Sequence, residues 1–333
     1  MHVKEKTPHA ETRKRTAGEG AQVTLYGDIK PDPVTTATFL KPDPPLLIPA
    51  YGIGVDSTSV LVKLKRLGIR PALILTADAG LEWPETYAYL PVINEWLRGV
   101  DFPEVTIVRK RSPQVCDITL EDELTRLGLL PAIAYGKGSC SAKWKISGQE
   151  YFLNHWEPAL REWKRGRKIV RAIGYEANEC NRVDEASTYQ KSNPSRKFDY
   201  WHPLVEWNDS RADCIQTIKD EGLPLPPKSA CWLCSSSKKH EIERLARVHP
   251  DLFLRALLVE RIAEPKNIKV KGLGRNFAWK SLPCAAPFHE ELDWIMEERE
   301  RARQAGFIPL TRGARIIHGV TPPASAEEWP VAA

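Results

Sequence analysis

The stretch Leu46-Leu-Ile-Pro-Ala-Tyr-Gly-Ile-Gly-Val-Asp-Ser-Thr-Ser-Val-Leu61 joins a short apolar run to a turn with two glycines, a polar cluster and an amphipathic helical pattern. This order predicts a strand, a tight loop and the start of a helix. A helix start carries unpaired backbone N–H groups and the positive end of the helix dipole, which together attract anions. The stretch therefore predicts a loop that binds phosphate groups.

Each residue type in this loop has a chemical reason to be there. Gly52 and Gly54 let the backbone turn tightly and approach an anion. The hydroxyls of Ser57–Ser59 are able to cap the helix and donate to phosphate oxygens. Asp56 would repel phosphate, so we expect it to cap the helix or to hold Mg²⁺. The loop lacks the lysine of a Walker A motif and the third glycine of a dinucleotide fingerprint, so by glycine spacing alone it could also be an ordinary strand–turn–helix joint.

Strand and helix patterns alternate along the next part of the chain. This alternation predicts an α/β fold with a doubly wound, mainly parallel sheet, whose ligands bind at the carboxyl ends of the strands. The expected strands are residues 46–50, 71–76, 105–108 and 169–173, and the expected helices are residues 60–67, 84–97, 120–129, 209–221 and 239–263.

The expected organisation has four parts. They are a polar, disordered segment (1–44), a nucleotide-binding α/β domain (45–208), a helical C-terminal region with a Cys-x-x-Cys pair (209–308) and a tail (309–333). Residues 180–203 read as a polar loop.

Composition limits the class of protein. The 333 residues carry a net charge of +5, with no apolar run long enough to span a bilayer and no visible secretory signal. Seven cysteines without an export signal fit reduced thiols or metal ligands in a cytoplasmic protein better than a disulfide framework. The basic run 161–171 fits either a solvated helix end or a patch for nucleic acid phosphates.

A second polar cluster follows the next expected strand. It reads Ala77-Asp-Ala-Gly-Leu-Glu-Trp-Pro-Glu-Thr86. Pro84 with acidic neighbours suits the first turn of a helix, so capping alone could explain Glu82 and Glu85.

The first stretch resembles a loop of a known superfamily, and five further motifs, in order, resemble one of its families. The first stretch resembles the Ser-Gly-Gly-x-Asp-Ser pyrophosphate loop of the adenine nucleotide alpha hydrolase superfamily, with Gly52 in place of Ser and Ile53 in place of the first Gly. The second cluster resembles the Asp-Thr-Gly-x-Glu-x-Pro-Glu-Thr string of phosphoadenosine phosphosulfate reductase-like proteins. Further similarities, to the phage- and plasmid-type members among others, lie at residues 139–146, 173–182, 202–207 and 228–234. Together they cover residues 46–285.

The resemblance implies an ATP pyrophosphatase that adenylates a substrate for sulfur transfer or nucleic acid modification. Residues 310–333 contain no cysteine, so the Glu-Cys-Gly-x-His segment of true reductases is missing and sulfonucleotide reduction is not expected. Two alternatives stay open: a weakly catalytic nucleotide-binding module in a phage or defence complex, and a thiol redox enzyme. The acceptor could be tRNA, DNA, a nucleoside or a small metabolite, and a sulfur donor protein is an expected partner.

The resemblance also implies a set of site residues. The expected catalytic residues are Asp56, Lys143 and Arg182, with Lys145 as a further cation. The residues expected to bind ATP and Mg²⁺ are Tyr51, Gly52, Gly54, Val55, Asp56, Ser57, Thr58, Ser59, Asp78, Gly80, Glu82, Gly174 and Glu179.

Cys231 and Cys234 have the spacing of a metal-binding or redox pair, although two buried thiols would give the same pattern. Cys140 is the expected third ligand and Cys284 the fourth, with Cys180 as a competitor. The resemblance favours a 4Fe–4S cluster. Zinc stays open as the alternative because His240 and His249 are near in sequence, and Cys116 and Cys214 are expected to be structural.

Overall fold

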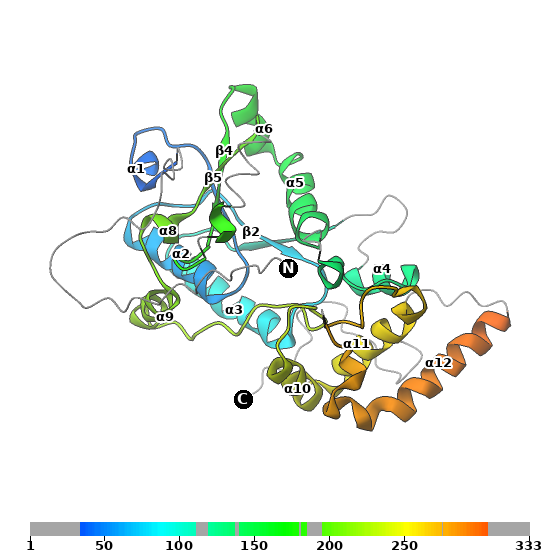
Figure 1. Ribbon diagram of the computed structural model, residues 1–333. Helices are drawn as coiled ribbons and strands as arrows, with labels where there is room; N and C mark the ends of the chain where they lie inside the picture. The colour runs from blue at the N-terminus through cyan, green and yellow to red at the C-terminus, as the bar shows by residue number, and fades with distance from the viewer. Residues whose placement is uncertain are drawn as a thin grey trace, which may run out of the picture. The chain divides into compact units, whose positions relative to one another are not determined.

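A parallel sheet forms the centre of the described part of the chain (Figure 1). The computed structural model describes residues 34–110, 119–136, 140–179, 181–184, 195–274 and 276–305. The strands are β1 (Leu47–Ala50), β2 (Ile74–Asp78), β3 (Val105–Arg109), β4 (Ile169–Ile173) and β5 (Phe198–Trp201). All the pairs are parallel and the order is β3-β2-β1-β4-β5, which confirms the predicted α/β fold.

The strand order places the first loop at the switch point of the sheet. The chain passes from β1 outward to β3 and then returns to the other side of β1. Ala50 at the end of β1 is paired with Leu75 on one side and with Ile173 on the other. The segments that follow β1 and β4 therefore leave the same edge side by side, where ligands of such sheets bind.

Helices cover both faces of the sheet (Figure 1). Leu47 packs in the cluster with α2 (Val55–Arg66), α3 (Pro84–Gly99) and α9 (Arg211–Asp220), whereas its neighbour Ile48 packs in the cluster with α5 (Ser147–Leu153) and α6 (Glu157–Lys164). Successive strand residues point to opposite faces, so a strand buried on both faces is apolar throughout.

Three short elements were not expected from the sequence. Strand β5 and helix α8 (Pro203–Glu206) lie within or just after the stretch read as a loop, and helix α1 (Thr36–Phe39) lies in the stretch expected to be disordered. The rings of Phe39 and Trp201 are 4.8 Å apart and both are buried. Elements of four residues have too little periodicity to be recognised, and tertiary contacts hold them.

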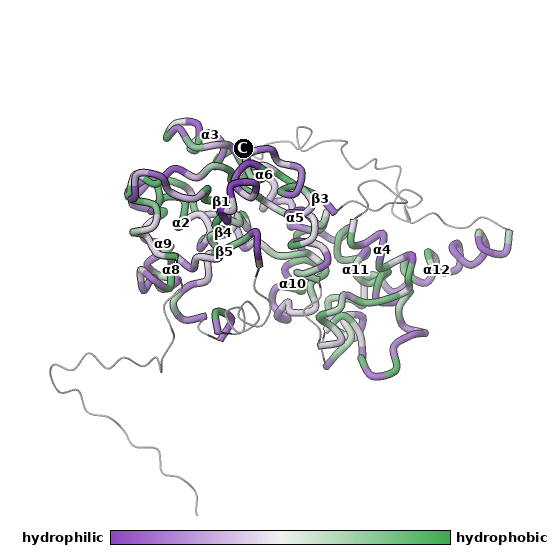
Figure 2. Tube along the Cα trace, turned by 90° about the horizontal axis from the view of Figure 1, so that it is seen from above, coloured by the Kyte–Doolittle hydropathy of each residue, from purple (hydrophilic) through white to green (hydrophobic). Residues whose placement is uncertain are grey.

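The C-terminal part is helical, as predicted. Its helices pack with α4 (Leu120–Leu127) around a second core that includes Leu81, Trp144 and Trp232. They are α10 (Lys239–Val248), α11 (Pro250–Ala263) and α12 (His289–Gln304). Short helical turns lie at residues 264–266, 279–281 and 283–288 of this part and, earlier in the chain, at residues 132–135 and 141–146. The last turns of α12 are hydrophilic (purple in Figure 2).

The described residues belong to one unit that begins at Asp32. Helix α9, just beyond the expected boundary at residue 208, packs against α2 of the nucleotide fold. The division at that boundary stays a prediction. Within the described residues, no helix has both the length and the apolar character of a membrane span.

Candidate active site

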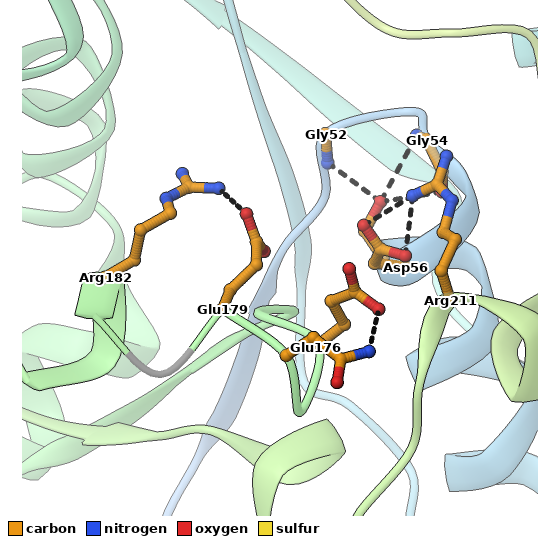
Figure 3. A network of polar contacts seen from close by, with 9 residues as sticks. Gly52, Gly54, Asp56, Glu176, Glu179, Arg182 and Arg211 are labelled. Carbon is orange, nitrogen blue, oxygen red and sulfur yellow. Dashed lines mark hydrogen bonds and ion pairs between the residues drawn. The ribbon is translucent and has the colours of Figure 1, made fainter. Parts of the chain in front are cut away.

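The hydroxyl of Ser57 lies at the centre of the first loop. Its Oγ accepts hydrogen bonds from the backbone N–H groups of Gly52 (3.2 Å) and Gly54 (3.3 Å), and it donates to the carbonyl of Gly54 (3.1 Å). Figure 3 shows the two amides directed at this oxygen. The loop therefore already points backbone donors at one oxygen atom, which is the arrangement that an anion-binding loop requires.

Ile53 adopts a left-handed backbone conformation, with φ of 58°. A β-branched residue rarely takes positive φ, whereas glycine does so without a steric cost. The motif that this loop resembles has glycine at the matching position, which agrees with the left-handed conformation, and Ile53 keeps the same turn at a steric cost. Its side chain is only 2% exposed, and its burial in the core stabilises the strained backbone.

The neighbouring hydroxyls face the interior. Thr58 and Ser59 are fully buried, and the Thr58 hydroxyl lies 3.1 Å from the Tyr51 hydroxyl. Their side chains therefore hold the base of the loop, and Ser57 supplies the hydroxyl on the loop side. Val55 starts helix α2 and is buried.

Asp56 pairs with an arginine that the sequence did not point to. The Nη1 atom of Arg211, at the start of α9, lies 2.7 and 2.6 Å from the two carboxylate oxygens (Figure 3). Burial raises the pKa of Asp56, Arg211 opposes the rise, and the nearby carboxylates of Glu176 and Glu179 add to it. The Mg²⁺ role expected for Asp56 stays a prediction.

The segment after β4 lies against the loop. A Cβ on Gly174 would be 3.2 Å from the backbone nitrogen of Ser57, so a side chain there would disturb the helix start. Further on, Glu179 forms an ion pair with Arg182 (Figure 3). The Arg182 guanidinium lies over the Tyr175 ring at 4.5 Å. Both residues sit at the expected edge, and the catalytic role of Arg182 stays a prediction.

Asp78 shapes the turn after β2. It is 2% exposed and accepts hydrogen bonds from Arg109 (2.8 and 2.9 Å), the Tyr87 hydroxyl (2.6 Å) and the Gly80 amide (2.7 Å). Gly80 has φ of 74°, and a Cβ there would come within 2.5 Å of the Thr119 side chain. These contacts give Asp78 and Gly80 a structural role, and nucleotide contact by either residue stays a prediction.

The Cys-x-x-Cys segment pairs with the chain that follows β2. The Trp232 amide donates to the Leu81 carbonyl (2.8 Å) and the Trp83 amide donates to the Ala230 carbonyl (3.3 Å), so that Cys231 lies opposite Glu82. This pairing brings residues that are about 150 positions apart to the carboxyl edge of the sheet. No periodicity in the sequence signals such a pairing.

Glu82 is the polar centre of this junction. Its carboxylate is buried, accepts a hydrogen bond from Ser229 Oγ (3.2 Å) and lies 3.5 Å from Lys145 Nζ. Burial would lower the pKa of Lys145, but the carboxylate of Glu82 and the nearby thiols of the Cys-x-x-Cys pair raise it. Ser229 also lies beside the phosphate loop, because a Cβ on Gly54 would be 3.6 Å from the Ser229 Cβ.

Lys143 points to a different partner. It forms an ion pair with the buried carboxylate of Glu123, which also accepts a hydrogen bond from Lys110 at 2.9 Å. Of the two lysines predicted as cations, Lys145 is therefore the one at the cysteine segment. The catalytic role of Lys143 stays a prediction.

Cys140, Cys231 and Cys234 lie in one neighbourhood. Burial raises the pKa of the Cys231 thiol to about 12, with smaller contributions from Glu82 and from the other two cysteines. Cys284 has Glu243 as its charged neighbour, and Cys180 lies outside the described residues. Among the described residues, no group of three His, Cys, Asp or Glu side chains is close enough to hold a metal ion.

The two histidines of the zinc alternative have other partners. His249 Nε2 lies 3.1 Å from Glu85, and His240 is largely exposed, with Glu241 at 4.0 Å. In the basic run 161–171, four residues form ion pairs with carboxylates at residues 43, 157, 162 and 199, and Arg171 is buried. This pairing favours the solvated helix end over a phosphate patch.

Fold and site together define a doubly wound parallel α/β protein with a tight loop between β1 and α2 at its switch point and a cysteine segment beside that loop. Comparison with known protein families and with curated protein sequences finds no match. Among solved structures, the chain is similar to the U34-tRNA thiolase NcsA from Methanococcus maripaludis with its 4Fe–4S cluster. The TM-score is 0.37 at 12% identity, and the similarity covers 73% of this chain and 80% of that one.

Proposed function

We propose that this chain is an ATP pyrophosphatase that adenylates an acceptor for sulfur transfer or nucleic acid modification. One observation carries the proposal: the cysteine segment reaches the phosphate loop, with Ser229 against Gly54 and Cys231 opposite Glu82. A nucleotide on the loop and a thiol-based sulfur centre would thus share one site. Sulfur transfer to an activated substrate needs this proximity.

The loop residues would act by binding and charge stabilisation. The amides of Gly52 and Gly54 and the hydroxyl of Ser57 would hold the terminal phosphates of ATP, with Mg²⁺ as counterion. An acceptor oxygen would attack the α-phosphorus, and the bond to the bridging oxygen of the β-phosphate would break, so that pyrophosphate leaves. Preorganised donors lower the barrier of such a step because they need no rearrangement as charge develops.

The thiols suit a sulfur-handling role. Thiolates are the ligands of iron–sulfur clusters, and the proposal takes Cys140 as a ligand beside Cys231 and Cys234 because both Cys140 and Cys234 act electrostatically on the Cys231 thiol. A bound cluster would supply a site for carrying sulfur.

Pyrophosphate release tests the proposal. Purified protein with ATP, Mg²⁺ and a candidate acceptor, tRNA or DNA first, is expected to release pyrophosphate. Asp56→Ala and Ser57→Ala are expected to reduce release at least tenfold, while Ser195→Ala, which removes a hydroxyl three residues before β5, is the matched control. ATP binding without release for any acceptor would favour the nucleotide-binding module instead.

Anaerobic purification tests the cluster. We expect iron and visible absorbance that Cys231→Ala and Cys140→Ala abolish and Cys214→Ala, a buried thiol on α9, does not. Zinc in place of iron would refute the cluster. Nucleic acid that copurifies with the protein would identify the acceptor class. A cytoplasmic location and a sulfur donor protein complete the proposal.

A further inference from the structure

Arg211 joins two helix starts at the phosphate loop. It is the first residue of α9, and its guanidinium reaches Asp56 in the first turn of α2, with both contacts made through Nη1. The side chain remains 46% exposed despite this ion pair. It therefore presents a cationic group to solvent at the place where the loop amides gather.

Several carboxylates lie around Asp56, and Arg211 offsets part of their negative charge. Asp56 lies near the carboxylates of Glu176 and Glu179, and Glu179 is paired with Arg182. Three carboxylates at one edge would repel a polyphosphate. Among the described residues, Arg211 is the cation that forms an ion pair with Asp56 (Figure 3). It therefore neutralises the carboxylate that lies closest to the start of α2.

The Arg211 guanidinium also has N–H donors that Asp56 does not engage. Its Nη2 and Nε atoms have no hydrogen bond to a described residue, and a guanidinium presents five N–H groups in a plane that matches phosphate oxygens. We propose that Arg211 binds a phosphate group of the nucleotide while it stays attached to Asp56. It thus acts as a phosphate ligand and as a shield between the carboxylate and the phosphates. This inference rests on the proposed function, because it assumes that the loop binds ATP.

Calorimetric titration of the full chain with ATP and with adenosine tests the inference. Arg211→Ala is expected to weaken ATP binding at least tenfold, as loss of a charge-assisted hydrogen bond does, and to leave adenosine binding unchanged. In the double variant Arg211→Ala/Asp56→Asn, ATP affinity is expected to recover in part, since the repulsion is gone but the phosphate contact is still missing. Arg70→Ala removes another exposed arginine paired with an aspartate, Asp101, and is expected to change nothing.

The outcomes separate the inference from the proposed function. ATP binding by Arg211→Ala within twofold of the unaltered chain, or an equal loss for adenosine, would overturn the phosphate contact. Full recovery in the double variant would also overturn it, because Arg211 would then act only on Asp56. If the unaltered chain binds no ATP, the proposed function itself fails. Circular dichroism checks folding, and Arg211→Gln, which keeps most of the side-chain length, replaces Arg211→Ala if that variant unfolds.

Discussion

Substitutions at Ile53 separate backbone strain from core packing. The side chain is 2% exposed and the backbone has φ of 58°. Truncating a buried isoleucine to alanine costs about 2–5 kcal/mol. A left-handed conformation costs a residue with a Cβ about 1–2 kcal/mol, which glycine avoids. Ile53→Gly is therefore expected to be more stable than Ile53→Ala by about 1 kcal/mol, although both are less stable than the unaltered chain.

Ile48 is the matched control. It is the same residue type, fully buried, in the middle of β1. In a strand, glycine is worse than alanine by about 0.5–1 kcal/mol, so the order of the two variants should reverse. The difference in the free energy of unfolding between the glycine and the alanine variant is therefore expected to change by about 2 kcal/mol from Ile53 to Ile48.

Urea unfolding measures this difference. The free energy of unfolding is compared for Ile53→Gly, Ile53→Ala, Ile48→Gly and Ile48→Ala. The comparison requires that the denaturant slope is the same for all four variants. If Ile53→Gly is less stable than Ile53→Ala by the same margin as at Ile48, the strain argument is refuted. Ile53→Gly restores the motif residue, so we also expect it to bind ATP at least as well as Ile53→Ala.

Three further predictions concern the edge of the sheet and its supports. Gly174→Ala should weaken ATP binding severalfold, because its Cβ would press on the start of α2, whereas Gly99→Ala has open space and should bind normally in the same titration. Asp78→Ala should lower the free energy of unfolding by about 2 kcal/mol in urea, since it removes the buried carboxylate that accepts hydrogen bonds from Tyr87 and Arg109, and an unchanged midpoint would contradict that role. Burial would raise the pKa of Glu123, but hydrogen bonds from two lysines lower it below the ordinary 4.5. The stability from its charge is therefore present above pH 4.5 and lost as pH falls through the lowered folded value, so Glu123→Gln should destabilise at pH 7 and less so at pH 3.5.

The local patterns were sufficient for the sheet and the long helices. Strand Ile169–Ile173 has the predicted bounds, and helix Pro84–Gly99 begins at the predicted proline. The second strand begins at Ile74, three residues later than expected, and helix Pro84–Gly99 ends about two residues later than expected, whereas the helices expected over 239–263 are Lys239–Val248 and Pro250–Ala263. These errors lie at boundaries, where tertiary contacts decide the last turn or ladder position.

The site was predictable only in part. Gly52, Gly54 and Ser57 form the loop as expected because their roles depend on neighbouring residues. Asp78 and Lys143 have charged partners that the sequence did not indicate, Arg109 and Glu123. Arg211 and Ser229 were not predicted, because neither lies in a stretch where its role could be read from near neighbours.

The sequence by itself therefore determined the order of strands and helices, the parallel sheet and the position of the tight loop between β1 and α2. Each of these follows from hydrophobic period, turn residues and helix capping, which act over a few residues. Only the tertiary structure decided that Arg211 neutralises Asp56, that Ile53 takes a left-handed conformation, and that the cysteine segment pairs beside the loop. Those features depend on charges and backbone groups brought together from distant parts of the chain, and no local pattern encodes which of them will meet.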